Sequence, residues 1–323
     1  MGGVNAVVPI RRLVAVSLNA AIDKIAAVDR LVPGEIHRPD LLTTLPGGKA
    51  VNAARAAVQL GLPAEVVAVV AGHAGSWLEA ALERRGIPGR YVRVDGETRT
   101  CLSVHDRSSG LLTEFYEAGV TLPTDRWPAV EERLSEALLD DPVGTVVLLA
   151  GSLPPGAPID AYRRLAVVAK AAGARAVVDV GGEPLRAALD AAPWLVKVNG
   201  DEASSVSGVA VVDAGAAMTA AGRLRELGAE HVLVTLGVDG AVLVGPAGAW
   251  RVGPPPELGP YSVGSGDTFM AGFLAALRRE QDVAGALRLA AAAGAANALI
   301  PGQGELDLAD VERLAPAVDM RLA

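Results

Sequence analysis

Residues 145–149 read TVVLL, an alanine-rich segment of helical period follows from Ile159, and residues 176–180 read AVVDV. Two short β-branched runs joined by a helical segment are typical of parallel strands linked by a crossover helix. The same alternation extends in both directions, through Leu13–Leu18, a helix from Val51, Val66–Val70, a helix near Trp77–Arg85, Trp194–Val198, a helix around Ala214–Leu227, Val232–Thr235, the hairpin-like pair Ala241–Val244 and Trp250–Val252, and helices from about Asp267 and Val283. The pattern predicts an α/β fold with a mostly parallel sheet covered on both faces.

Two stretches interrupt this alternation. They are Ile25–Leu45 and Thr98–Glu117, the second of which alternates polar and apolar residues around the turn Arg107–Gly110. Alternation of this kind predicts strands that lie outside the main sheet, and we expect them to form a small lid. The pattern otherwise continues along the chain without a repeat, so we predict a single domain over residues 1–323, with lid strands from about 25–45 and 98–117.

Composition excludes several classes of protein. The chain has 323 residues, of which 51% are apolar, and this predicts an ordered globular protein. A net charge of -8 argues against a surface that binds nucleic acid. Cys101 is the only cysteine, so we expect it to be buried and free in a reducing cytoplasm. Met1–Arg12 lacks the pattern of a signal peptide, and Leu287–Ile300 is too short to span a membrane and predicts a packed helix.

The segment YSVGSGDTFMAGF, residues 261–273, carries the strongest chemical signal. Glycines directly before a helix leave its first N–H groups uncovered, and those groups together with the helix dipole stabilise an anion. In the functional interpretation, Asp267 accepts a proton from an alcohol while the adjacent N–H groups hold a phosphoryl group. In the alternative interpretation, Asp267 only caps the helix and the glycines only turn the chain. The position of Asp267 in the sequence leaves both open.

A second segment, LPGGKAVNAAR at residues 45–55, opens a helix that ends near Gly61. Its paired glycines let a ligand approach the backbone, while Lys49 and Asn52 supply a cation and an amide about one helical turn apart. The segment therefore predicts a site for a polar ligand. The alternative is a loop that enters a helix and carries a solvated lysine.

Four further polar loops follow predicted strands, namely Ser17–Asp23, Gly151–Gly156, Lys197–Glu202 and Thr235–Ala241. Open α/β sheets bind their ligands at the carboxyl ends of the strands. Each loop taken alone is better explained as a turn, but together they predict one convergent site.

This ordered set of motifs, from about Leu13 to Gly304, resembles the PfkB family of carbohydrate kinases. The resemblance implies a ribokinase-like, three-layer α/β/α fold and ATP-dependent phosphorylation of a sugar hydroxyl. Gly47–Arg55 and Val263–Phe273 are similar to the two signatures of that family. By this resemblance Asp267 is the catalytic base, and the anion hole is formed by Gly264, Ser265 and Gly266.

The resemblance also assigns a nucleotide side to the site. Lys197, Asn199 and Glu202 match the family's element for nucleotide phosphates and magnesium, with Glu202 serving the metal indirectly. The residues implied to bind the nucleotide are Lys197, Asn199, Thr235, Gly237, Gly240 and Asn297, the last from the helix that borders the adenine. ATP and Mg²⁺ are the implied cofactors, and a monovalent cation is left open.

Within the family, the motifs are similar to the branch that phosphorylates sugar phosphates, which includes 1-phosphofructokinase, tagatose-6-phosphate kinase and a minor 6-phosphofructokinase. The implied contacts to sugar hydroxyls are Asp23, Gly48, Asn52 and Ser152. The existing phosphate is implied to face Lys49, Arg99 and, in the widest interpretation, Arg38; a solvated surface position is the alternative for Arg38 and Arg107. Because such lids often pair between subunits, the resemblance also implies a homodimer.

Four positions depart from the family pattern: Ala20, Ala50, Val198 and Ser265. Ala50 adds a methyl group beside the sugar, so a different acceptor is an alternative. Two further alternatives are a kinase of an unphosphorylated sugar or nucleoside, and a sugar- or nucleoside-binding member of the fold with altered catalysis. A dinucleotide-dependent oxidoreductase is disfavoured because Phe269 stands where the third glycine is needed.

Overall fold

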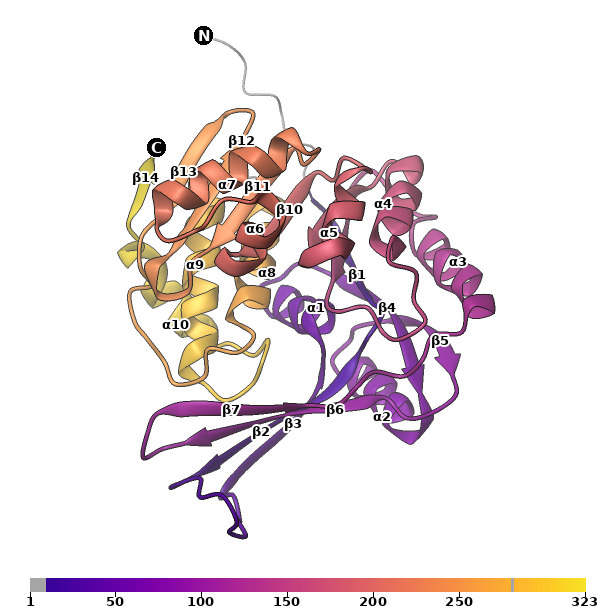
Figure 1. The fold of residues 1–323 in the computed structure, drawn as a ribbon, viewed down its shortest axis with the longest axis vertical. Coiled ribbons are helices and arrows are strands. Elements are labelled where there is room, and N and C mark those ends of the chain that lie inside the picture. The colour runs from indigo at the N-terminus through magenta and orange to yellow at the C-terminus, as the bar shows by residue number, and fades with distance from the viewer. Residues whose placement is uncertain (1–9, 280–281) are drawn as a thin grey trace.

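The computed structural model describes residues 10–279 and 282–323. Within these ranges a ten-stranded sheet has the order β14-β13-β12-β11-β10-β9-β8-β1-β4-β5 (Figure 1). Its strands are β1 (Arg12–Ser17), β4 (Ala64–Ala71), β5 (Gly89–Val94), β8 (Thr145–Ala150), β9 (Arg175–Asp179), β10 (Leu195–Asn199), β11 (His231–Thr235), β12 (Ala241–Gly245), β13 (Gly248–Val252) and β14 (Met320–Leu322). All neighbours from β5 to β11 pair in parallel, and β12 to β14 add an antiparallel edge. The predicted mostly parallel sheet is confirmed.

Helices cover both faces of this sheet (Figure 1). One face carries α1 (Lys49–Gln59), α2 (Gly72–Glu83), α8 (Ser265–Arg278), α9 (Val283–Leu299) and α10 (Leu308–Leu314). The other carries α3 (Trp127–Ala137), α4 (Ala161–Ala172), α5 (Gly182–Leu189), α6 (Gly200–Ser207) and α7 (Ala214–Glu226). Successive side chains of a strand point to opposite faces, so Leu13 and Ala15 enter the first core and Val14 and Val16 the second. The predicted three-layer α/β/α fold is confirmed.

The lid is a separate sheet of four strands within the described residues, in the order β3-β2-β6-β7 (Figure 1). Its strands are β2 (Ala21–Val28), β3 (Leu41–Gly47), β6 (Arg99–Asp106) and β7 (Leu111–Tyr116). β6 and β7 lie within residues 98–117, whereas β2 and β3 extend from residue 21 to residue 47, beyond 25–45 at both ends, because Ala21 pairs with Gly47 at the far end of β3. As a result Asp23 belongs to the lid rather than to the loop that leads into it.

Several smaller expectations can be compared with the structure. Residues 287–300 were expected to form a packed helix, and all but the last of them lie in the largely buried α9. Cys101 is buried and free, as expected. The expectation about a leader concerns residues 1–12, most of which lie outside the described ranges. Among the helices that the structure describes, none has the length and apolar character needed to cross a membrane.

Candidate active site

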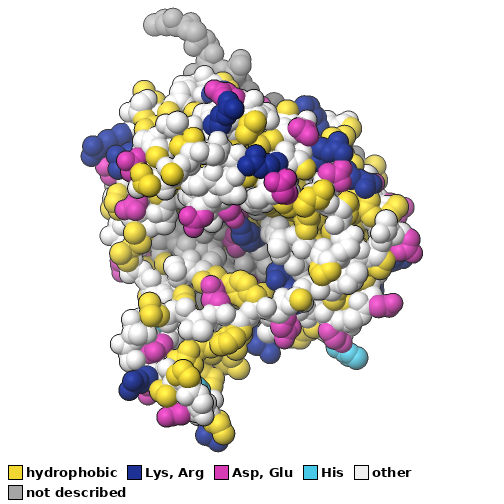
Figure 2. Space-filling model, in the orientation of Figure 1, with side chains coloured by type: hydrophobic (Ala, Val, Ile, Leu, Met, Phe, Trp, Pro, Cys, Tyr) yellow, Lys and Arg dark blue, Asp and Glu magenta, His cyan; other side chains and the backbone are white. Residues whose placement is uncertain are grey.

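A hollow separates the body of the molecule from the lid, and basic and acidic side chains gather inside it (Figure 2). Residues from both predicted signatures meet across the body. The Asn52 amide, on α1, donates from Nδ2 to Oδ2 of Asp267, on α8, over 3.1 Å, although 215 positions separate the two residues in sequence. Both side chains are buried. The convergence of the two signatures is therefore a direct contact.

Asp267 is the third residue of α8, and the residue that caps this helix is Gly264, in the left-handed region with φ 89°. Asp267 makes no capping hydrogen bond to the start of α8 among the described residues. The interpretation of Asp267 as a helix cap is therefore wrong. The glycine three residues earlier takes the cap position, which leaves the carboxylate free to point at Asn52.

Burial raises the pKa of the Asp267 carboxyl to about 7, and the nearby Asp179 carboxylate adds to this effect. Lys197, Lys49 and the Asn52 hydrogen bond act in the opposite direction. A carboxyl group that titrates near neutral pH suits general base catalysis at physiological pH, because it is substantially ionised there and still accepts a proton readily.

The start of α8 next to Asp267 is open. The N–H groups of Gly264 and Gly266 have no hydrogen-bond partner in the part of the chain that the structure describes, whereas Ser265 N–H donates to the Ser262 carbonyl over 3.2 Å. A Cβ atom on Gly266 would lie 2.8 Å from Nζ of Lys197, so only glycine lets this lysine approach. Of the three residues predicted for the anion hole, Gly264 and Gly266 thus offer free backbone donors, whereas Ser265 offers only its buried hydroxyl, which has no partner among the described residues.

A buried carboxylate joins the two lysines of the predicted motifs. Asp179, the last residue of β9, accepts from Lys197 Nζ at 2.8 Å and from Lys49 Nζ at 3.2 Å. Burial alone would raise the pKa of Asp179, but Lys197 and Lys49 hold it below its usual value, and Asp179 in turn raises the pKa of Lys49. Sequence reasoning missed Asp179. Its signal was a lone acidic residue at the carboxyl end of the predicted strand AVVDV.

Lys49 contacts two carboxylates of the body. It was expected to face a phosphate already present on the sugar, yet its Nζ lies 3.2 Å from Asp179 and 3.4 Å from Glu202. Glu202 belongs to the element implied to serve nucleotide phosphates. The structure therefore brings Lys49 to Lys197 through a shared carboxylate instead of placing it with Arg99.

Asn199 and Glu202 form a capping box at the start of α6. Asn199 Oδ1 accepts from Glu202 N–H at 2.8 Å, and Glu202 Oε2 accepts from Asn199 N–H at 2.9 Å. The described residues contain no cluster of three side chains that would hold a metal ion by themselves. Mg²⁺ commonly keeps several water ligands and binds through phosphates with one or two carboxylates. The site fits such an ion, and Glu202 is the carboxylate that would serve it.

On the acceptor side, Asp23 is buried and its Oδ2 accepts from Gly48 N–H over 3.3 Å. Burial raises the pKa of this carboxyl. Asn19 Nδ2 donates to Oγ of the exposed Ser152 over 2.9 Å, and Arg99 Nη2 donates to the Asn19 carbonyl over 3.1 Å. The Arg99 Nε atom is buried with no partner among the described residues. The structure thus connects Ser152 and Arg99 through Asn19, which sequence reasoning noted only as part of a motif.

The Thr235–Gly240 turn and Asn297, both predicted to bind the nucleotide, have different surroundings. Thr235 is the register partner of Asn199, so the Thr235–Gly240 turn lies beside the start of α6. Asn297 has no exposed surface, its Nδ2 donates to the carbonyls of Gly302 and Glu305, and its Oδ1 has no partner among the described residues.

Two arginines in the turns between the lid strands lie elsewhere. Arg38 is exposed, and Arg107 pairs with Asp29 at 3.2 Å and Asp40 at 2.8 Å. These pairs support the surface interpretation for Arg107.

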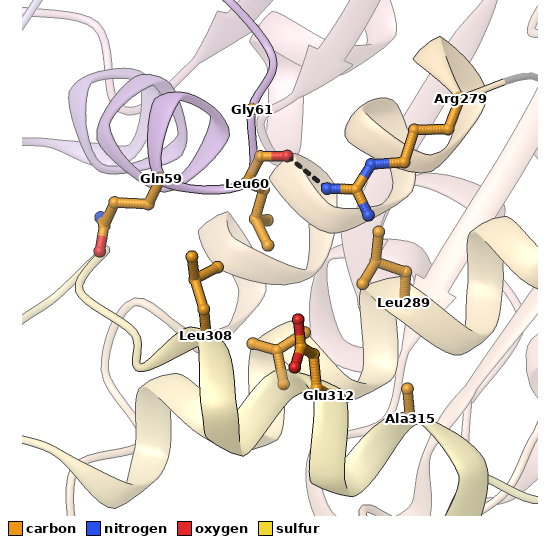
Figure 3. A pocket seen from close by; sticks show the side chains of 9 residues that line it. Gln59, Leu60, Gly61, Arg279, Leu289, Leu308, Glu312 and Ala315 are labelled. Atoms are coloured by element: carbon orange, nitrogen blue, oxygen red, sulfur yellow. Dashed lines mark hydrogen bonds between the residues drawn. The ribbon is translucent and has the colours of Figure 1, made fainter.

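A second cavity lies at the opposite end of α8 from Asp267 (Figure 3). Its volume is about 280 Å³, and its lining residues are Gln59, Leu60, Gly61, Arg279, Leu289, Leu308, Val311, Glu312 and Ala315. Figure 3 shows Arg279 donating to the Leu60 carbonyl, a bond of 2.9 Å. None of the predicted site residues lines this cavity.

An open helix start next to a buried carboxylate that titrates near neutrality suits phosphoryl transfer to an alcohol, and together with the lidded α/β body it places the protein among the lidded α/β kinases. Comparison with known protein families identifies the class more narrowly. The chain belongs to the pfkB family of carbohydrate kinases, whose model matches residues 11–308.

Individual relatives agree with this assignment. A 1-phosphofructokinase of Bacillus subtilis strain 168 is 31% identical over 303 residues, which cover 94% of this chain and 97% of the relative. The solved phosphofructokinase-2 of Escherichia coli in complex with substrates and products has a TM-score of 0.86 and 28% identity, covering 95% of this chain and 99% of that one. Arabidopsis thaliana ribokinase, solved with ribose and ATP, has a TM-score of 0.72 and 25% identity over 95% and 99% of the two chains. The predicted ribokinase-like kinase is confirmed.

Proposed function

We propose that the protein transfers the γ-phosphoryl group of ATP to a hydroxyl of a hexose phosphate, with Asp267 as the general base. One observation supports this role above the others: Asp267 is buried against the Asn52 amide and lies one residue from the free N–H of Gly266. A proton acceptor and a phosphoryl-binding donor are therefore adjacent. Their position on consecutive residues suits an in-line reaction in which the hydroxyl loses its proton as it attacks.

The chain's own groups divide the remaining work. Asn52 orients the carboxylate through its 3.1 Å hydrogen bond, and the N–H groups of Gly264 and Gly266 would stabilise the oxygens of the transferred group. Lys197, which lies against Gly266, would neutralise their charge. Magnesium, when bound, would supply further neutralisation of the phosphates, with Glu202 nearby. The Thr235–Gly240 turn is the proposed contact for the rest of the nucleotide.

The proposed acceptor follows from the relatives and from the distribution of cations. The Bacillus subtilis relative is named a 1-phosphofructokinase. A phosphate on the acceptor needs a cation that is not already neutralised by a carboxylate. Lys49 is committed to Asp179 and Glu202, whereas the Arg99 guanidinium contacts only a backbone carbonyl among the described residues. We therefore assign Arg99 to the acceptor phosphate and Lys49 to the transferred group.

A coupled assay tests the proposal with fructose 1-phosphate, fructose 6-phosphate, tagatose 6-phosphate, ribose and adenosine, each with ATP and Mg²⁺, and with and without K⁺. One charge-assisted contact should favour a phosphorylated acceptor in kcat/KM by about 10- to 100-fold. Faster turnover of ribose or adenosine would overturn the acceptor class. Acceptor binding without ATP consumption would instead indicate a binding protein.

The lid is the proposed dimer interface. Leu42 on β3 and Leu111, Phe115 and Tyr116 on β7 are each more than half exposed, and exposed apolar side chains mark interaction surfaces. We expect a homodimer by light scattering at assay concentration, and a monomer there would contradict the assignment. The reducing cytoplasm stays the proposed compartment, because the single cysteine is buried and unpaired.

A further inference from the structure

Arg55 is a fully buried cation directly behind the proposed base. It lies on α1, three residues after Asn52, and only 1% of its surface is exposed. Its Nη1 donates to the Pro46 carbonyl at 2.8 Å, to the Gln303 carbonyl at 2.9 Å and to Asn52 Oδ1 at 3.3 Å. Its Nη2 pairs with Glu305. The proposed mechanism does not use this side chain, although burying a guanidinium is costly unless it is paired and hydrogen-bonded.

The contact with Asn52 favours one end of the amide toward the base, and Asp23, whose carboxylate is also stabilised by the Asn52 side chain, favours the same end. An asparagine amide has a donor end and an acceptor end, and a guanidinium has donors only. Arg55 therefore requires the Asn52 oxygen on its side, and this turns the NH₂ group toward Asp267, 3.1 Å away. Without Arg55 the amide could rotate and present its oxygen to the carboxylate, which would favour the protonated acid.

The other charged groups around Asp267 come from three elements. They are Lys49 on α1, Asp179 on β9 and Lys197 on β10, and together with burial and the Asn52 bond they are the leading influences on this carboxyl. Arg55 is not among them. Its influence on Asp267 is therefore expected to pass through the orientation of the amide.

We propose that Arg55 is a positioning residue that fixes the Asn52 amide with its NH₂ group toward Asp267. The inference rests on the proposed role of Asp267 as the base, and it extends the proposed mechanism to a residue that contacts neither substrate. Arg55 also holds the Gln303 carbonyl in the loop that packs against Gly264, so the same side chain supports the open start of α8.

The test compares two variants. Arg55→Met/Glu305→Gln removes the guanidinium together with the charge that would otherwise be left unpaired, and the matched control Glu305→Gln keeps the contact between Arg55 and Asn52. The Asp267 carboxyl is followed by ¹³C NMR in protein labelled at aspartate, with the signal assigned from its loss in Asp267→Asn. We expect the titration midpoint to rise by about one pH unit in the double variant, since a hydrogen bond to a charged group is lost, and to stay in place in the control. An unchanged midpoint in the double variant would overturn the proposal.

The fall of kcat on the acid side of its pH profile, called the acid limb, is measured on the same proteins. If Asp267 is not the base, the NMR midpoint still moves while the acid limb does not, so failure of the mechanism is distinguished from failure of this inference. In an Asn52→Ala background, removal of Arg55 should produce no further shift. A full shift in that background would mean that Arg55 acts through its charge, which also overturns the proposal.

A measurement on the unmodified protein covers the case in which the double variant does not fold. The side-chain ¹⁵N–¹H₂ signals of Asn52, assigned from their loss in Asn52→Ala, should shift with the same midpoint as the Asp267 carboxyl, because the NH₂ group bonds to it. Amide signals that do not follow this titration would show that the oxygen faces Asp267 and would refute the proposed orientation.

Discussion

Two helices begin at the same site in opposite ways. At the start of α6, Asn199 and Glu202 satisfy one another's backbone N–H groups. At the start of α8, Gly264 supplies no side chain, and the N–H groups of Gly264 and Gly266 find no partner among the described residues. A capped helix start has used the donors that an anion would need. Of these two glycine-bearing motifs, the start of α8 therefore suits binding of the phosphoryl group. The start of α6 instead stabilises its helix and holds the Glu202 carboxylate in place.

The largest expected effect is at the open helix. Asp267→Asn keeps the shape of the side chain but cannot take a proton, so kcat should fall at least ~10²-fold. ATP affinity should hardly change, because the donors of Gly264 and Gly266 remain. Steady-state kinetics of the purified variant measure both. Near-normal turnover would remove Asp267 as the base and with it the contrast between the two helices.

The titration of Asp267 gives a second prediction with a defined sign. Only the ionised carboxylate accepts a proton, so kcat/KM should fall about tenfold per pH unit below pH 7. Folding raises this pKa from 3.8 to about 7, so the folded protein keeps a proton that the unfolded chain has lost, and the contribution to stability falls as pH rises through that window. Asp267→Asn should therefore melt no lower than the parent protein at pH 8. A lower melting temperature at pH 8 would contradict the raised pKa.

Gly266→Ala probes the approach of Lys197 to the open helix start. The added Cβ atom would lie 2.8 Å from the lysine Nζ, so the ammonium must move away from the phosphoryl position. We expect kcat to fall by about 10- to 100-fold, somewhat less than for the loss of a complete donor. Gly222→Ala in α7 is the matched control, because its Cβ would meet nothing within 4 Å. Equal kinetics for the two variants would show that Lys197 does not act at Gly266.

Substitutions of Lys49 and Arg99 are expected to affect different substrates. Lys49→Met should lower kcat, and Arg99→Met should raise KM for the phosphorylated acceptor, each by about 10- to 100-fold. Initial rates with each substrate varied in turn distinguish the two patterns. The reverse pattern would return Lys49 to the acceptor phosphate, where the sequence alone had placed it.

The smallest effect is expected at the capped helix. Asn199→Ala should lower the free energy of unfolding by about 1 kcal/mol and leave kcat almost unchanged, because its side chain serves the start of α6. Asp213→Ala is the matched control, since Asp213 caps α7 by accepting from Ala216 N–H at 2.8 Å. Chemical denaturation and kcat are measured on both variants. A large loss of kcat in Asn199→Ala alone would place Asn199 on the nucleotide phosphates.

Much of the fold could be predicted because its strands are buried on both faces and read as continuous β-branched runs. Thr145–Leu149 and Ala176–Val180 were placed within one residue of β8 and β9. The short elements were missed. Among them, α6 spans eight residues, and its Gly-Asp-Glu start was interpreted as a ligand-binding loop. Its capping box has the same residue types as a phosphate site, and only coordinates show which partner they have.

The candidate site was predictable wherever a motif lies on one stretch of chain. Asp267 and Asn52 were both found, although their contact was not, because 215 positions separate them. Asp179 carried no motif at all, and it gains its place only when β9 and β10 bring it beside Lys197. The contacts of Lys49 with Asp179 and Glu202 could not be foreseen for the same reason. The carboxylates that attract Lys49 are supplied by other elements of the fold.

At one of the connections between lid and body, the chain passes through a single residue. Gly48 alone separates the end of β3 from the start of α1; its N–H holds Asp23 of the lid, and its carbonyl accepts from Asn52 N–H in the body. Any rotation of the lid about this hinge also turns the helix that orients the base. Because the lid carries Asp23 and α1 carries Asn52, Gly48 joins the carboxylate proposed for the acceptor to the amide that contacts the proposed base.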